Sequence, residues 1–191
     1  MLAAISQEEY LTIERGSLEK HEYYQGEITM MAGAPRNHNR VKDNFSVEVG
    51  IFLKHKRCQH FTSDMRVHIP KDEFYTYPDL VIVCGKIEVL DNQEDTLLNP
   101  SVIVEVLSKG TADYDRAEKF ERYRSIESFQ EYILVDSRRI KVEVWRKNEQ
   151  GLWTLVQETS NLEDKIEIRT IEHSILIEDI YAQTVGLLHL S

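Results

Sequence analysis

The sequence contains no apolar run close to the ~20 residues that a membrane-spanning helix requires. Its first residues include Glu8, Glu9 and Glu14 and lack the basic start of a secretory signal peptide, so we expect a cytoplasmic protein. Neither an internal repeat nor a low-complexity linker interrupts the chain. Its 191 residues, 41% of them hydrophobic, are enough for one sizeable core, which predicts a single domain over residues 1–191.

Cysteine is scarce, since Cys58 and Cys84 are the only two. They lie far apart in the sequence and do not have the CxxC spacing of a zinc or redox site. They are also too few for the disulfide scaffold of a small secreted protein. Both are therefore predicted to be reduced thiols.

Positive charge is in deficit, with 23 lysines and arginines against 33 aspartates and glutamates and a formal net charge of −10. This argues against a protein whose whole surface binds nucleic acid, because phosphate neutralisation needs clustered cations. The objection is weakened because metal-binding carboxylates count as negative and because binding depends on the local field. Three basic clusters occur, at residues 54–57, 138–141 and 146–147, although solvated surface charge is the ordinary role of such residues.

The pattern of apolar residues predicts alternating helices and strands. A capping box of Ser6 and Glu9 indicates a helix at about residues 6–15, and the Gln25-Gly26 turn indicates a hairpin over residues 21–31. Further helices are predicted over residues 38–53 and 113–124 and near 177–182, and strands over residues 61–69, 80–84, 102–107, 132–135, 141–146, 152–157 and 165–168. This order predicts an α/β (α+β) sandwich, in which helices flank a mixed β-sheet and additional β-strands lie at the C-terminus.

Two carboxylates stand in strongly apolar surroundings. Asp79 precedes the apolar run 80–84, and Glu105 lies inside the run 102–107; such runs are typical of central strands that are covered on both faces. An ionised carboxylate removed from water costs several kcal/mol unless a cation or strong donors compensate it. If neighbouring strands aim Asp79 and Glu105 at one point, they form a hard-oxygen site suited to magnesium. The alternative is a buried Glu105 paired with an arginine or with backbone donors.

Three further residues are candidates by position. Lys119 lies on the helix after the second apolar run, with Asp115 and Tyr123 one turn away on either side. An ordinary helix-surface ion pair, contributing a few tenths of a kcal/mol, is the alternative there. His38 enters the long helix and can equally be a polar cap or a surface residue. Glu27 follows the hairpin turn and can be an exposed strand residue.

Several motifs are spread along most of the chain: Tyr24-Gln25-Gly26-Glu27, Pro35-Arg36-Asn37-His38, Tyr77-Pro78-Asp79-Leu80, Val104-Glu105-Val106-Leu107-Ser108, Thr111, Asp115-Arg116, Lys119, Tyr123 and Glu131-Tyr132-Ile133-Leu134-Val135-Asp136. Together they resemble the Uma family of bacterial proteins classed as restriction endonucleases, within the PD-(D/E)XK nuclease superfamily. The superfamily's signature is Pro-Asp opening one strand, then an acidic residue, any residue and lysine on the next. Pro78-Asp79 and Glu105 match this signature, but Leu107 occupies the expected lysine position.

The resemblance implies a restriction-endonuclease-like fold and metal-dependent hydrolysis of DNA phosphodiesters. It implies that Lys119 reaches back into the site, where it would orient the attacking water or steady the developing charge. Asp79, Glu105 and the Val106 carbonyl would hold Mg²⁺, and Mn²⁺ would fit the same ligands. Two further residues would assist: Glu27, as another ligand or by holding a metal-bound water, and His38, by contacting phosphate or transferring a proton.

Two other interpretations remain open. The acidic composition and Leu107 favour a catalytically silent nuclease-fold module with a binding or regulatory role, and a different metal-dependent hydrolase could use the same scaffold. A homodimer is compatible with a double-strand cutter, because closed two-fold symmetry is the commonest oligomeric arrangement. The sequence displays no groove contacts that would reveal a recognition sequence.

Overall fold

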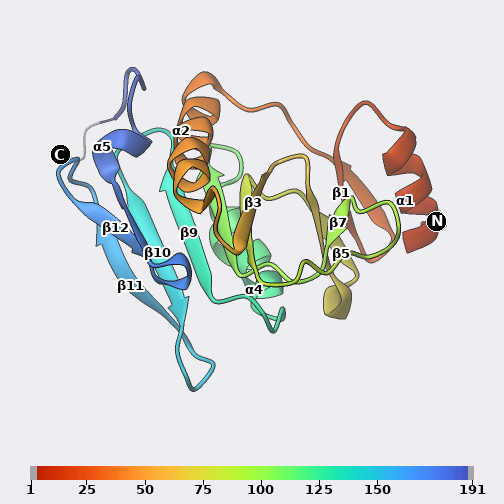
Figure 1. Ribbon diagram of the computed structural model, residues 1–191. Helices are drawn as coiled ribbons and strands as arrows, with labels where there is room; N and C mark the ends of the chain where they lie inside the picture. The colour runs from red at the N-terminus through yellow and green to blue at the C-terminus, as the bar shows by residue number, and fades with distance from the viewer. Residues whose placement is uncertain (1–3, 189–191) are drawn as a thin grey trace.

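The computed structural model describes residues 4–188. Its strands form a six-stranded sheet, a five-stranded sheet and a separate two-stranded hairpin. Figure 1 shows the five-stranded sheet beside α1 near the N-terminus and the six-stranded sheet on the C-terminal side of the molecule. No helix among the described residues is both long enough and apolar enough to cross a membrane.

The six-stranded sheet has the order β11-β10-β9-β8-β6-β3. Its central pair β8 and β9 is parallel and the other pairs are antiparallel, so the sheet is mixed, as the sequence predicts. The strands are β3 (Cys58–Thr62), β6 (Leu80–Cys84), β8 (Val102–Leu107), β9 (Glu131–Asp136), β10 (Val142–Lys147) and β11 (Trp153–Thr159).

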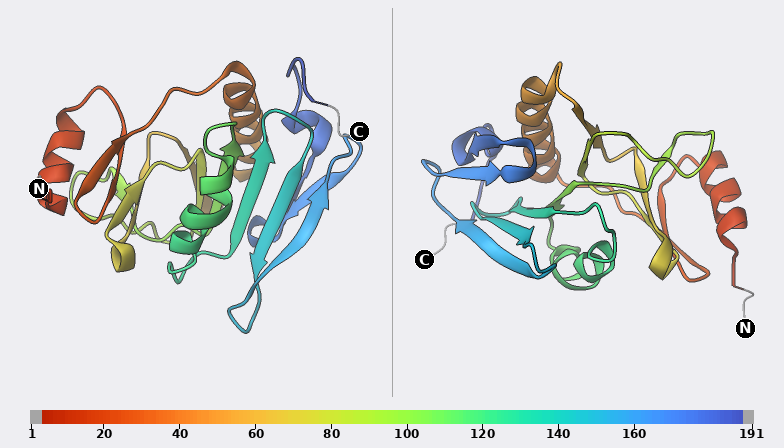
Figure 2. Two further views of the ribbon diagram at one scale, coloured as in Figure 1. Left: turned by 180° about the vertical axis from the view of Figure 1, so that it is seen from behind. Right: turned by 60° about the horizontal axis from the view of Figure 1, so that its bottom comes forward.

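Helices cover both faces of this sheet (Figure 2). On one face lies α2 (Arg36–Leu53), which buries Val41, Phe45 and Val49 against the sheet in a shared core. On the other face the chain forms α3 (Ala112–Tyr114), a π-helical turn η2 (Asp115–Lys119) and α4 (Phe120–Tyr123). Each large apolar side chain buried in this way contributes about 1.5–3 kcal/mol. The central strands are buried on both sides, as their apolar runs predict.

The N-terminal region contains α1 (Gln7–Gly16), whose capping box of Ser6 and Glu9 is present. The five-stranded sheet has the order β2-β1-β5-β4-β7. Its strands are β1 (His21–Tyr24), β2 (Glu27–Met30), β4 (Arg66–Ile69), β5 (Phe74–Thr76) and β7 (Thr96–Leu97), and a 3₁₀ turn η1 (Pro70–Asp72) joins β4 to β5. The single strand predicted over residues 61–69 is wrong. The chain turns after Thr62, where the Met65 N–H donates to the Thr62 carbonyl, and β3 and β4 belong to different sheets.

The C-terminal part adds a small hairpin to the α2 side of the six-stranded sheet. It consists of β12 (Lys165–Ile168), the 3₁₀ turn η3 (Arg169–Ile171) and β13 (His173–Leu176), followed by α5 (Ile177–Ile180). Strand β13 was not predicted. Ile166, Ile175 and Ile177 join the core beneath α2, so these extra elements close one face of the sheet.

The two cysteines form a disulfide, which corrects the prediction of two reduced thiols. Cys58 and Cys84 are direct partners in the antiparallel pairing of β3 with β6, and their Cα atoms lie 4.1 Å apart. Their separation of 26 residues in the sequence was a poor guide, because the strand register brings them together.

Candidate active site

Asp79 and Glu105 meet where β6 begins. Leu80 pairs with Val104 in the antiparallel register, which places Asp79 opposite Glu105 on the neighbouring strand. The Asp79 N–H donates to Glu105 Oε2 (3.2 Å), and the Val106 N–H donates to Asp79 Oδ2 (2.8 Å). Each carboxylate is therefore fixed by a backbone donor of the other strand, and Glu105 is only 3% exposed.

Lys119 reaches this pair from the π-helical turn. Its Nζ lies 2.9 Å from Glu105 Oε1 and 3.7 Å from Asp115 Oδ1, and the Tyr123 hydroxyl donates to the same Glu105 oxygen at 2.8 Å. Lys119 is buried, so the alternative of a helix-surface ion pair is wrong. A π-helical turn widens the helix locally and is frequent at functional sites, whereas sequence periodicity predicted only a regular helix.

The hairpin contributes Glu22 to the site, a residue that the sequence reasoning missed. Glu22 Oε1 lies 3.4 Å from Lys119 Nζ, and Glu22 also accepts hydrogen bonds from the Thr76 and Tyr114 hydroxyls. Glu27, which was nominated instead, is exposed at the start of β2, and its side chain forms no hydrogen bond or ion pair within the described chain. Nothing in the sequence marks Glu22, because its partner Lys119 lies 97 residues further on and in another layer.

His38 lies in the first turn of α2. Its Nε2 is 3.3 Å from Asp79 Oδ2, and its side chain is largely buried. Its other ring nitrogen, Nδ1, is buried without a hydrogen-bond partner among residues 4–188. The structure thus brings His38 to Asp79, which a simple helix cap or a surface residue would not require.

The site contains more negative than positive charge. Glu22, Glu105 and Asp115 all form ion pairs with the single ammonium of Lys119. Asp79 lies on the other side of Glu105, next to His38. Burial raises the pKa of Glu105 to about 8, outweighing the opposite effect of Lys119, and burial also raises the pKa of Asp115. Burial alone would lower the pKa of Lys119, but the surrounding acidic groups hold it well above its usual value. The lysine stays charged, and within residues 4–188 no second lysine or arginine forms an ion pair with these carboxylates.

The donor chemistry fits a magnesium or manganese ion. The described residues hold no group of three or more His, Cys, Asp or Glu side chains placed as a metal cage. Mg²⁺ rarely uses such a cage, since it keeps several waters and binds one or two carboxylates together with substrate phosphate. Asp79 and Glu105 would supply the carboxylates. The Val106 carbonyl faces the same side of β8 as its N–H, which bonds to Asp79, because both groups of a strand residue point the same way.

Comparison with known proteins identifies the fold and the family of this chain. A crystal structure from Anabaena variabilis, described as "a putative nuclease belonging to DUF820", has a TM-score of 0.75, is 16% identical and covers 93% of this chain and 98% of its own. At that identity the likeness shows the fold, which is restriction-endonuclease-like. Two Synechocystis proteins are also similar. Protein sll1609 is 39% identical over 78% of this chain and 84% of its own, and slr1290 is 33% identical over 93% and 91%.

The family identification rests on the greater part of the sequence. The Uma2 family, described as "Putative restriction endonuclease", matches residues 7–175, which include Glu22, His38, Asp79, Glu105 and Lys119. This protein belongs to the Uma2 family.

Proposed function

We propose that this protein is a metal-dependent endonuclease that hydrolyses DNA phosphodiester bonds. One observation carries the proposal: three carboxylates form ion pairs with one lysine, and a fourth, Asp79, lies beside Glu105 at the point where two central strands meet. A divalent cation would supply the missing positive charge. Membership of a family classed as restriction endonucleases supports DNA as the substrate.

Asp79, Glu105 and the Val106 carbonyl would hold Mg²⁺, or Mn²⁺ in its place. A bound ion of this kind polarises the scissile phosphate and lowers the pKa of a coordinated water. The reciprocal hydrogen bonds between Asp79, Glu105 and Val106 hold these ligands in place before the ion arrives, which reduces the ordering that binding requires.

Lys119 would orient the attacking water or steady the negative charge that develops on phosphate. Glu22 helps to position it, because Glu22 accepts from Tyr114 and Thr76 while it contacts the Lys119 ammonium. His38, next to Asp79, is placed to contact phosphate or to transfer a proton. Lys119 would thus take the role that the signature gives to the residue at position 107, where Leu107 is buried in the apolar core between the sheet and α3–α4.

Replacement of Asp79 by alanine tests the proposal. We expect the wild type to nick supercoiled plasmid in Mg²⁺ or Mn²⁺ and Asp79→Ala to lose roughly 1,000-fold or more of that rate. Asp113→Ala is the matched control, since Asp113 is an exposed carboxylate near the start of the same helical segment as Lys119. Thermal unfolding of each variant separates loss of the site from loss of the fold. Unchanged cleavage by Asp79→Ala would exclude the proposed site.

A wild type that binds metal and DNA but turns over neither plasmid nor small phosphodiesters would instead establish the silent-module alternative. Turnover of small phosphodiesters alone would indicate a different hydrolase. Cleavage of both DNA strands further predicts a homodimer with two sites, and sedimentation velocity tests that assembly directly.

A further inference from the structure

Two unusual groups of unpaired cations lie at the two ends of α2. Six of the 23 lysines and arginines fall within residues 36–57, on α2 and the turn after it: Arg36, Arg40, Lys42, Lys54, Lys56 and Arg57. None of the six forms an ion pair with a carboxylate anywhere in residues 4–188. The same segment has only two acidic residues, Asp43 and Glu48. It therefore has a net charge of +4 in a chain whose net charge is −10.

The other basic clusters noted in the sequence are largely neutralised. Arg138 and Arg139 both contact Asp136, Lys141 contacts Glu143, and Arg146 contacts Glu131. Those cations hold the β9–β10 region together and have little charge left for an external partner. The six cations of α2 and the turn after it are different, because all of them except Lys42 are exposed and their charge faces solvent.

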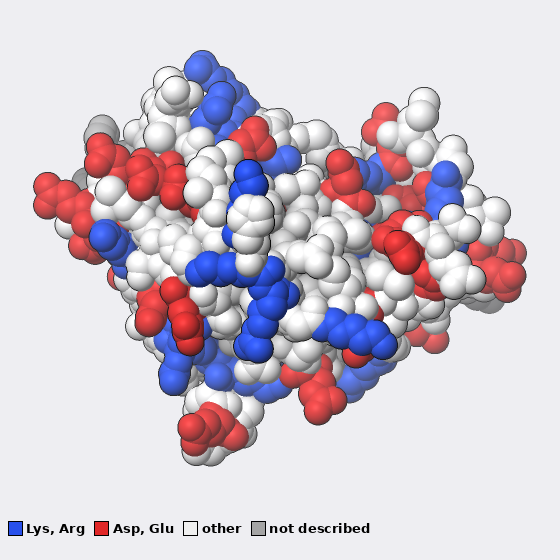
Figure 3. All heavy atoms as spheres, viewed as in Figure 1, with Lys and Arg blue, Asp and Glu red and all other residues white. Residues whose placement is uncertain are grey.

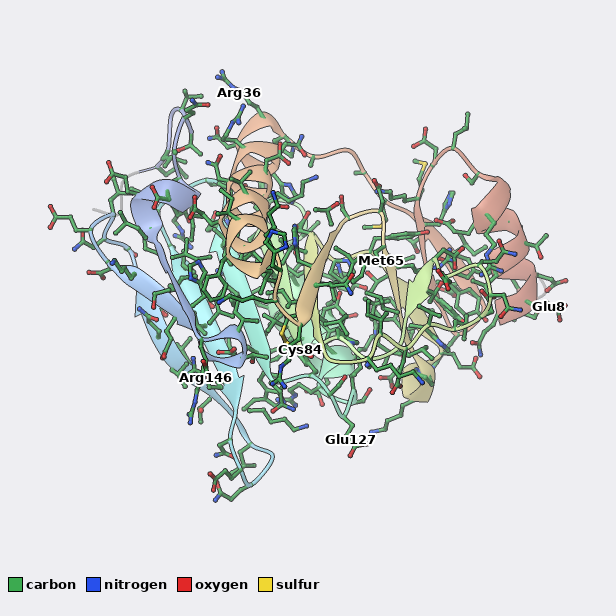
Figure 4. The ribbon with its side chains drawn as sticks, viewed as in Figure 1. Glu8, Arg36, Met65, Cys84, Glu127 and Arg146 are labelled. Atoms are coloured by element: carbon green, nitrogen blue, oxygen red, sulfur yellow. A yellow bond between two sulfur atoms is a disulfide. The ribbon has the colours of Figure 1, made fainter. Side chains whose placement is uncertain are left out.

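This cationic face begins at the active site. His38, in the first turn of α2, contacts Asp79, and Lys42 lies one turn further along with its Nζ 3.4 Å from Ser63 Oγ. Figure 3 shows lysines and arginines running from the upper end of α2 down the middle of this face, with acidic side chains mainly to either side. Arg36, labelled in Figure 4, projects from the upper end of the helix.

We infer that α2 and the turn after it bind the phosphate backbone of a DNA strand as it leaves the active site. The inference rests on the proposed function and says where the substrate lies. An 18-residue helix is about 27 Å long, so the cations at its start and those after its end are spaced to contact phosphates up to roughly eight apart on one strand, at 3.4 Å each. The acidic remainder of the surface repels a polyanion and so restricts it to this face. The net charge of the whole chain therefore does not oppose DNA binding.

Two variants of equal net charge separate the effect of local charge on DNA binding from the effect of total charge. The first, Arg40→Gln, Lys54→Gln and Arg57→Gln together, removes three charges from the α2 face. The second, Lys71→Gln, Lys165→Gln and Arg169→Gln together, removes three exposed cations elsewhere. Binding of a fluorescein-labelled 24-base-pair duplex is measured by anisotropy in EDTA from 20 to 200 mM salt, so that the result does not depend on cleavage. Circular dichroism confirms that both variants are folded.

We expect the α2 variant to bind at least about ten-fold more weakly at low salt. The slope of log affinity against log salt should fall by about 2 to 3, because each phosphate contact contributes about 0.9 on duplex DNA. The control should stay within about two-fold of the wild type. Equal loss in both variants, or no binding by the wild type, would overturn the inference. If α2-dependent binding occurs without cleavage in any divalent metal, the proposed function fails while the inference stands.

Discussion

Two of the clusters of charged side chains in this molecule, one in the N-terminal region and one at the candidate active site, differ in how their charges are balanced. In the N-terminal sheet, Arg15 forms hydrogen bonds to Asp91 and Asp95, and Arg66 contacts Asp95 from a buried position. Glu14 is held close by, through the Tyr77 hydroxyl and the His21 ring. Hydrogen bonds from Arg15 hold the pKa of Asp95 and of Asp91 below their usual range. Each carboxylate in this cluster has a firm donor, as expected of a structural network.

The candidate active site departs from that balance. Its carboxylates outnumber the ammonium of Lys119, and burial raises the pKa of Glu105 where the pKa of Asp95 is lowered. The carboxylates of the N-terminal cluster are paired with arginines, whereas those of the candidate active site have too few cationic partners. This difference supports the proposal that a cation binds at the site from outside, since an excess of buried carboxylates without a cation costs stability.

Replacement of Glu105 by glutamine should have the largest effect, because it removes one of the carboxylates that distinguish the candidate active site from the N-terminal cluster. We expect Glu105→Gln to lose Mg²⁺ and Mn²⁺ binding in calorimetry, with a Kd at least about 100-fold weaker, together with plasmid cleavage. The metal-free protein, by contrast, should become more stable. Glutamine retains the shape of the side chain and removes one buried negative charge.

The raised pKa of Glu105 determines how the stability of the metal-free protein changes with pH. Glu105 has a pKa of about 8 in the folded protein against an ordinary value of 4.5, so its contribution to stability is fully present below about pH 4.5 and is lost as the pH rises to 8. Metal-free wild type should thus lose Tm over this interval, Glu105→Gln should lose less, and added Mg²⁺ should restore the wild type at pH 8. Identical pH profiles for the two proteins would argue that Glu105 is adequately neutralised by Lys119.

Arg66→Gln tests whether the N-terminal cluster serves stability alone. Because Arg66 is buried beside Asp95, Thr96 and Tyr77, its loss should lower the free energy of unfolding by about 3–5 kcal/mol. Urea denaturation measures this, and metal binding should remain within two-fold of the wild type. Arg124→Gln, in an exposed ion pair with Glu121, should cost less than about 1 kcal/mol. If Arg66→Gln weakened metal binding as strongly as stability, the two clusters would not be independent.

Much of the fold follows from local sequence patterns. The capping box at Ser6, the Gln25-Gly26 turn and the apolar run 80–84 each specify an element that the structure contains. The division at residues 63–65 was not predictable in the same way, because the residues on either side of the turn have similar β character. Which sheet a strand joins depends on partners far away, as with β7, whose two residues pair with β4.

The residues of the candidate site likewise differ in how far local sequence predicts them. The sequence marks Asp79 and Glu105, because carboxylates are conspicuous within apolar strands. Lys119 and His38 were candidates by position, but only the family resemblance gave them roles in the site. Glu22 was missed, since its contacts to Lys119 and Tyr114 cross between layers. The Arg66 cluster was also unforeseen, because its members come from α1, β1, β4 and the loop before β7.

A smaller effect is expected at His68, two residues after Arg66 on β4. Its ring stacks on Tyr75 with centroids 4.0 Å apart, and both ring nitrogens are buried without partners among the described residues. Burial lowers its pKa to about 4, with a further contribution from Arg66. The unfolded chain therefore takes up the proton first, and stability is lost as the pH falls from about 6.5 to 4, by roughly 3 kcal/mol at most.

His68→Phe keeps the stacked ring and should remove this part of the acid sensitivity, as measured by urea midpoints at pH 7, 5.5 and 4. Equal losses in variant and wild type would assign the acid sensitivity to the paired carboxylates instead. Because Arg66 also opposes protonation of His68, Arg66→Gln should itself reduce the dependence between pH 6.5 and 4. The two substitutions should therefore be non-additive, as expected if the N-terminal cluster stabilises the protein as one electrostatic unit.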